Sequence, residues 1–86
     1  MISGRLIERS DVKEIETREG RRARVSNIRI EDHTGKIRVS LWDEHSESVD
    51  KLRLGDTIRL TGVKIRSSPM GDMEASTVSL TQLEKI

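Results

Sequence analysis

The sequence contains no cysteine, no phenylalanine and no tyrosine, and only one proline and one tryptophan. Without cysteine, neither a disulfide framework nor a thiolate metal site can form, which favours an intracellular protein. No apolar run approaches the length that crosses a bilayer, and the first residues lack the apolar segment of a secretory signal. We therefore expect a cytoplasmic domain with no membrane partner.

The 86 residues suffice for one domain, and we expect a single domain over residues 1–86 with a thin core. The formal net charge is only +1, so the total charge does not demand a polyanionic partner. Its distribution is uneven, because residues 1–42 carry ten basic and seven acidic side chains while residues 43–86 carry six and eight. A local basic cluster can attract phosphates, although a run of charge is commonly just a solvated surface.

Apolar and polar residues alternate with a period of two along most of the chain, which indicates strands. We expect five strands, at residues 2–17, 21–31, 36–42 and 57–66, and from residue 73 onward. In the second strand, the apolar residues change phase between Val25 and Ile28. A β-bulge near Ser26-Asn27 would reconcile the two halves, and bulges are one way in which barrel strands curve.

Residues 43–52 break the alternation and favour a short helix, with Asp43 or Ser46 as a possible cap and Val49 and Leu52 on one side. Three strands, a short helix and two further strands are the order of the OB-fold, a partly open barrel whose central strands commonly bind oligonucleotides. We therefore predict an all-β, five-stranded OB-fold barrel with a short helix between strands three and four. An SH3-like barrel or a β-sandwich is the alternative, but neither explains the helical segment.

Trp42 is the only aromatic residue, and it ends the third strand. The apolar residues of that strand share one phase, at Ile37, Val39 and Leu41. Trp42 has the opposite phase and shares an outer face with Lys36 and Arg38, a setting that suits base stacking. The alternative is that Trp42 folds over the following helix as a packing lid, because aromatic side chains usually contribute to the core.

Basic residues of the neighbouring strands extend this outer face if Ala23, Val25, Val63 and Ile65 point inward. The side chains expected to contact backbone phosphates are then Arg22, Arg24, Lys36, Arg38, Lys64 and Arg66. The alternative is a scatter of solubilising charges without a common function.

Motifs for catalysis or metal binding are missing from the sequence. His33 and His45 lack the spacing of paired metal ligands, the glycines form no phosphate-binding loop, and no serine stands in a nucleophile motif. We therefore expect no enzymatic activity, no catalytic residue, no metal, no cofactor and no small-molecule substrate.

Residues 32–43 (DHTGKIRVSLWD), preceded by the strand from Val25 and followed by Leu54-Gly55-Asp56, carry a family pattern. They resemble the single-stranded-DNA-binding OB domains of archaeal replication protein A and of the related small archaeal single-stranded-DNA-binding proteins. The resemblance covers residues 4–76. It implies non-sequence-specific binding of single-stranded DNA in replication, repair and recombination, near the nucleoid, with Trp42 as a stacking residue.

Family members often carry further aromatic residues where this chain has Lys64 and the loop at residues 67–72, in which Met70 could offer a polarizable contact to a base. The lack of these aromatic residues implies that the domain binds DNA weakly by itself. Alternatively, it acts together with further OB domains or with other replication and repair proteins. Two other functions remain open, an OB module that binds proteins and an RNA-binding OB domain. The residues do not separate DNA from RNA.

Overall fold

The computed structural model describes residues 1–67, 69 and 73–86, and within them it forms eight β-strands and one short helix. The strands are β1 (Ile2–Arg9), β2 (Lys13–Glu16), β3 (Arg22–Asp32), β4 (Gly35–Trp42), β5 (Thr57–Thr61), β6 (Lys64–Ser67), β7 (Met73–Ser76) and β8 (Gln82–Lys85). The helix is η1 (Asp43–Lys51), a 3₁₀-helix between β4 and β5. It is too short to span a membrane.

The eight segments correspond to the five strands that the sequence predicts, because three of those strands are interrupted. The first divides into β1 and β2, the fourth into β5 and β6, and the last into β7 and β8. Gly62 lies at the interruption of the fourth strand with a φ of +75°, a conformation that favours glycine. The predicted all-β class and the position of the helix are confirmed, and the number of strand segments is corrected from five to eight.

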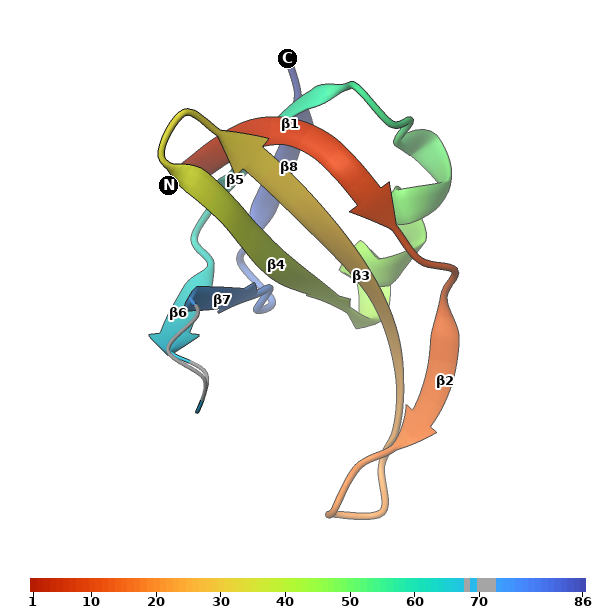
Figure 1. Ribbon diagram of the computed structural model, residues 1–86. Helices are drawn as coiled ribbons and strands as arrows, with labels where there is room; N and C mark the ends of the chain where they lie inside the picture. The colour runs from red at the N-terminus through yellow and green to blue at the C-terminus, as the bar shows by residue number, and fades with distance from the viewer. Residues whose placement is uncertain (68, 70–72) are drawn as a thin grey trace.

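One sheet contains all the strands and curls into a barrel. Its order is β6-β7-β4-β3-β1-β5-β8, and β2 pairs separately with β3 (Figure 1). The pair β6 and β7 lies at one end of this order, and the pair β5 and β8 lies at the other. The chain connects the two ends, because β5 is followed directly by β6 and β7 by β8. The pairing is antiparallel except between β4 and β7. The sheet therefore winds around a single core.

The core lies between the inner face of the sheet and η1. Its buried side chains come from five strands, from the helix and from the residue that follows the helix: Leu6, Ile28, Ile30, Val39, Leu41, Val49, Leu52, Ile58, Leu60 and Ala75. Ser26 is fully buried among them, and its hydroxyl donates to the Ser46 carbonyl at 3.0 Å. This bond fastens η1 to the middle of β3.

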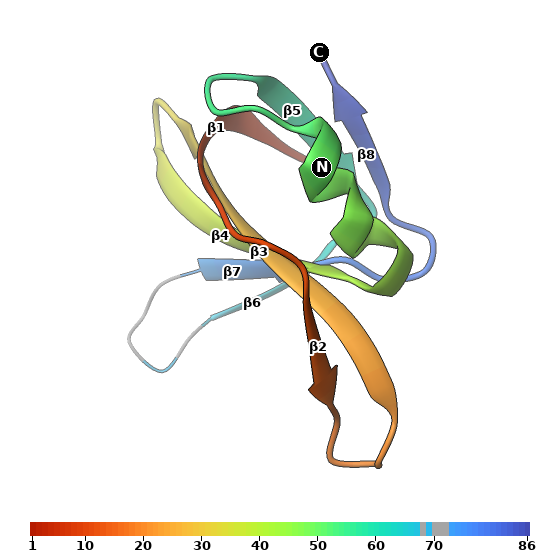
Figure 2. The same ribbon diagram turned by 90° about the vertical axis from the view of Figure 1, so that its right-hand side faces the viewer.

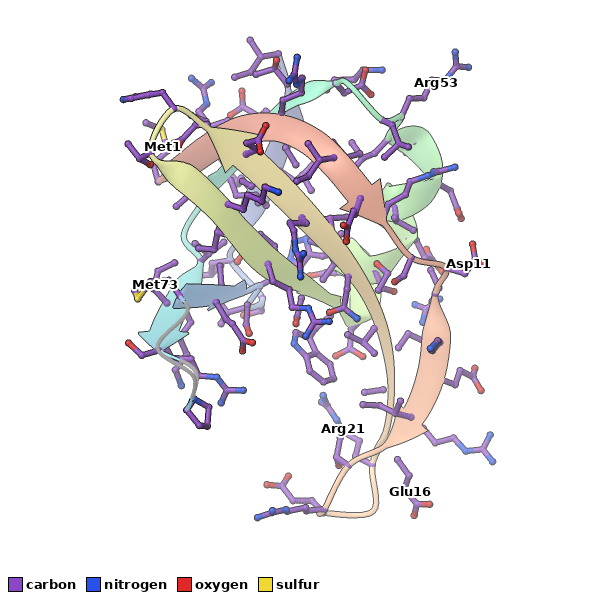
Figure 3. The ribbon with its side chains drawn as sticks, in the orientation of Figure 1. Met1, Asp11, Glu16, Arg21, Arg53 and Met73 are labelled. Atoms are coloured by element: carbon purple, nitrogen blue, oxygen red, sulfur yellow. The ribbon has the colours of Figure 1, made fainter. Side chains whose placement is uncertain are left out.

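The first part of β3 pairs with β2, and together they form a hairpin arm that extends away from the barrel (Figure 2). Figure 3 shows Glu16 and Arg21 on this arm, away from the barrel, on which Met1 and Met73 lie. Because the side chains of β2 are all exposed, the arm is held mainly by its pairing with β3.

The predicted bulge near Ser26 is wrong. The β3–β4 register runs without a shift from Val25, opposite Trp42, to Asp32, opposite Gly35. Ser26 faces the core with Ile28 and Ile30, so Val25 faces outward. The prediction took Ser26 for a surface residue because serine is polar. Its hydroxyl is instead buried and bonded to the Ser46 carbonyl of η1.

Candidate nucleic-acid interface

The outer surface of β3, β4, β7 and β6 forms a continuous face, which we call the outer face. Residues opposite each other on paired strands point to the same side, so the register assigns its rows. One row pairs Val25 with Trp42. The next row is Asn27, Ser40, Ser76 and Lys64, and the one after is Arg29, Arg38, Glu74 and Arg66. The face therefore combines one aromatic side chain with several cations.

Trp42 is half-buried and lies outside the hydrophobic core cluster, on the phase that the sequence predicts. Its backbone N–H donates to Oγ1 of the buried Thr77 at 2.8 Å, which fixes the end of β4. Asp43 follows with a φ of +49°, in the left-handed region, and its carboxylate accepts from the Arg24 backbone N–H at 3.3 Å. These contacts hold the backbone at Trp42 without using its indole ring.

The structure brings three of the predicted cations together with Trp42 on the outer face: Arg38, Lys64 and Arg66. Within the described part of the chain, none of the three lies within 4.0 Å of a carboxylate. Lys36 also lies on this face, but its Nζ is 3.9 Å from the Glu31 carboxylate. The basic character of the face is therefore strongest over β4 and β6.

Arg22 and Arg24 lie on the opposite face of β3, so their predicted position beside Trp42 is wrong. The prediction assumed that Val25 points inward, whereas Val25 points outward. Arg22 and Arg24 alternate with Val25, so their side chains point toward the η1 side. The Arg24 guanidinium forms an ion pair with Glu47 of η1, and the neighbouring Arg21 is 3.2 Å from Asp43. A phosphate contact by Arg22 or Arg24 stays a prediction, and it would not be made on the outer face.

Arg29 and Asn27 lie on the outer face, and the sequence analysis did not identify either. Arg29 stands directly opposite Arg38, and its guanidinium is 3.8 Å from the Glu8 carboxylate. The signal was present in the sequence, since Arg29 alternates with the buried Ile28 and Ile30. With the correct inward and outward assignment for β3, the sequence predicts Arg29 on the outer face.

On the far side of the barrel, at β5 and β8, two described cations are paired with carboxylates. Arg59 of β5 lies 2.8 Å from Glu84 of β8, and Lys85 lies 3.3 Å from Asp56. Exposed ion pairs of this kind contribute little to stability, but they neutralise the local field. The charge is thus asymmetric between the two sides although the net charge is only +1.

The turn between β3 and β4 borders the outer face. Hydrogen bonds from the Thr34 hydroxyl and from the Thr34 backbone N–H lower the pKa of Asp32, whose carboxylate thereby shapes the turn. Met70, predicted to contact a base, lies outside the described residues. In the described ranges, no group of three or more histidine or acidic side chains could hold a metal ion.

A family model described as the OB-fold nucleic acid binding domain matches residues 1–85. The chain therefore belongs to this family of nucleic-acid-binding OB-fold domains, which agrees with the predicted fold. The family is defined by binding and not by catalysis, as the sequence analysis expects.

Within the family, the chain is similar to replication factor A of Methanothermobacter thermautotrophicus, with 34% identity over 96% of this chain. It spans only 10% of the length of that relative. A solved replication factor A-related protein from Methanobacterium thermoautotrophicum is 33% identical, with a TM-score of 0.83 over 98% of this chain and 76% of the other. The resemblance to archaeal replication protein A domains is thus confirmed.

The second OB-fold domain of replication protein A from Methanococcus maripaludis has the same fold. It is 20% identical, with a TM-score of 0.80 over 98% of this chain and 79% of that one.

Proposed function

We propose that this domain binds single-stranded DNA without sequence preference, with Trp42 as the stacking platform and cations of the outer face as phosphate contacts. The observation that carries the proposal is that Trp42, Arg38 and Arg66 share one face. The two arginines have no described acidic partner, whereas Arg59 and Lys85 on the far side are paired with carboxylates. A positive groove that follows the backbone, combined with an aromatic ring under a base, is the usual means of binding single strands.

The names of the relatives support the setting. Replication factor A and replication protein A point to replication. We extend the proposal to repair and recombination, in which single-stranded DNA is also exposed. Lys36, Lys64 and Met70 complete the proposed set of contacts, together with Arg38 and Arg66. Arg22 and Arg24 are assigned no contact on this face.

The test is a comparison of wild type with Trp42→Ala, using end-labelled oligo-dT and fluorescence anisotropy. Loss of the indole should weaken binding by about 1–3 kcal/mol, the usual value of one stacked base. Far-UV circular dichroism should be unchanged, because the backbone of Trp42 is held by Thr77 and the ring lies outside the core cluster. If Trp42→Ala unfolds, the indole is a packing lid and the stacking proposal is wrong.

Two alternatives give different results in the same assay. Equal or tighter binding of oligo-U would favour an RNA-binding domain, since contacts to the 2′-hydroxyl distinguish the two polymers. Failure to bind either polymer would favour the protein-interaction module.

A further inference from the structure

A groove of 260 Å³ borders the outer face where β1 ends and β2 begins, and it shares Asn27, Arg29 and Arg38 with that face. Four cations and a single carboxylate line it, namely Arg9, Lys13, Arg29, Arg38 and Glu8. A second hollow, of 420 Å³, lies at the other end of the molecule, beside Met1 and Met73. Among its described lining residues, the charged side chains are Asp32 and Lys36, one of each sign. Of these two, the first groove therefore has the larger excess of basic side chains.

Two of the four cations face each other directly. Arg29 and Arg38 are opposite residues of β3 and β4, and like charges at opposite positions destabilise a sheet. Glu8 relieves Arg29 only in part, at 3.8 Å with both side chains exposed to solvent. An anion between the two guanidinium groups would remove the repulsion, and guanidinium pairs bind phosphate oxygens with matching geometry.

The floor of the groove is rigid and offers one more donor. The Asn27 backbone N–H donates to the Ser10 hydroxyl at 2.9 Å, and its carbonyl accepts from the Ser10 N–H at 2.8 Å. Its side-chain Oδ1 accepts from the Ser40 hydroxyl at 3.1 Å, so Nδ2 can donate outward. Arg9 is already engaged by the carbonyls of η1. Lys13, Arg29 and Arg38 are the cations left for a ligand.

We infer that this groove is a phosphate subsite for the nucleic-acid strand whose base stacks on Trp42. The inference rests on the proposed function and adds the course that the DNA backbone takes over the protein surface. Arg38 is four residues from Trp42 along β4, about 13 Å in an extended strand. Lys13 is opposite Val25, and Val25 is opposite Trp42, so Lys13 lies in the row of Trp42, whereas Arg38 and Arg29 lie four residues farther along β4 and β3. The backbone of the bound strand then runs along β4 from Trp42 to this pair of arginines, with Lys13 beside it, and away from the arm tip, where Arg21 is paired with Asp43.

The experiment measures oligo-dT affinity for wild type, Arg29→Gln and Arg59→Gln across a series of salt concentrations, with Trp42 fluorescence as the signal. Arg59 is a matched control, because both arginine side chains are 40% exposed and both are paired with a glutamate. Arg29→Gln should reduce the slope of log affinity against log salt by about 0.7, the value of one phosphate contact on a single strand. Arg59→Gln should leave the slope unchanged.

Thermal unfolding separates a binding role from a structural one. Removal of one of two opposed guanidinium groups should leave the unfolding temperature of Arg29→Gln equal to that of wild type or above it, while affinity falls. Quenching of Trp42 in wild type with an unchanged slope in Arg29→Gln would overturn the subsite and leave the proposed function standing. Absence of binding by wild type would overturn both.

Discussion

Glu74 is a carboxylate in the middle of a basic row, with Arg38 opposite on β4 and Arg66 opposite on β6. Neither arginine comes within 4.0 Å of it, so its charge is not consumed by a close ion pair. If a DNA backbone crosses this row, Glu74 repels it. The residue would then limit affinity.

We expect Glu74→Gln to bind oligo-dT more tightly than wild type, by a factor that shrinks as salt is added, because screening weakens the repulsion. Anisotropy titrations at two salt concentrations measure the effect. Glu84→Gln is the control, since Glu84 lies on the far side and is paired with Arg59. Equal gains from both variants would indicate a general charge effect and not a local one.

The residues of the interface were predictable where the alternation is regular. In β4 the core residues Val39 and Leu41 alternate strictly with charged and polar ones, and the predicted phase of Trp42 is confirmed. In β3 the prediction failed because Ala23 is buried on one phase and Ser26 on the other. A sequence pattern cannot reveal that a serine hydroxyl reaches a helix carbonyl, and that bond determines the phase.

Among the elements, β1 and η1 are joined by Arg9. One guanidinium nitrogen donates to the carbonyls of Val49 and Leu52, both at 2.7 Å. These carbonyls lie at the C-terminal end of the helix, where positive charge is favourable. The Val49 carbonyl also accepts from the Leu52 N–H at 3.2 Å. The contact holds the helix over the core residues that it contributes.

Arg9→Met should therefore lower the free energy of unfolding by roughly 1–2 kcal/mol, because two charge-assisted hydrogen bonds are lost while the apolar stem is kept. Urea unfolding followed by circular dichroism measures it. Arg5→Met on the same strand is the control, since the Arg5 guanidinium is 4.0 Å from Glu31 and largely exposed. Equal midpoints for the two variants would show that Arg9 does not clamp the helix.

The turn before β5 is shaped by Asp56. The backbone N–H of Arg53 donates to its carboxylate at 2.9 Å and lowers its pKa, and Lys85 of β8 adds to the effect. A lowered pKa means that the ionised carboxylate stabilises the fold. That stabilisation is present above the ordinary pKa of aspartate and is lost as the pH falls through the lowered one.

Asp56→Ala should accordingly unfold at a lower urea concentration than wild type at pH 7. The difference should shrink as the pH falls below about 4, because the carboxyl is protonated first in the unfolded chain and only at lower pH in the folded one. Urea titrations at a series of pH values between neutral and acid measure it. A difference that stays constant over this range would mean that the charge of Asp56 is not what stabilises the turn.

At the scale of the whole molecule, the net charge conceals the distribution that the proposal depends on. The sum of +1 includes ion pairs on the far side, whereas Arg38, Lys64 and Arg66 stand together on the outer face. The composition showed a basic excess in the first half of the chain. It could not show which cations are neutralised, because pairing depends on strand register and on contacts between distant elements.

The small share of the relative that this chain covers also bears on the expected affinity for DNA. The chain spans a tenth of the replication factor A that it resembles, and it has one aromatic residue. A single stacking platform supports modest affinity, and linked domains that bind one strand gain from effective concentration. We propose that the domain binds DNA weakly alone and more tightly beside further OB domains.

Titration of the wild-type domain with oligo-dT, followed by the intrinsic fluorescence of Trp42, tests the central claim most directly. No other tryptophan and no tyrosine contributes to the signal. Stacking of a base on the indole predicts saturable quenching that is reversed by added salt, as phosphate contacts are screened. Binding detected by anisotropy without any change in Trp42 emission would contradict the account, because the strand would then occupy another face.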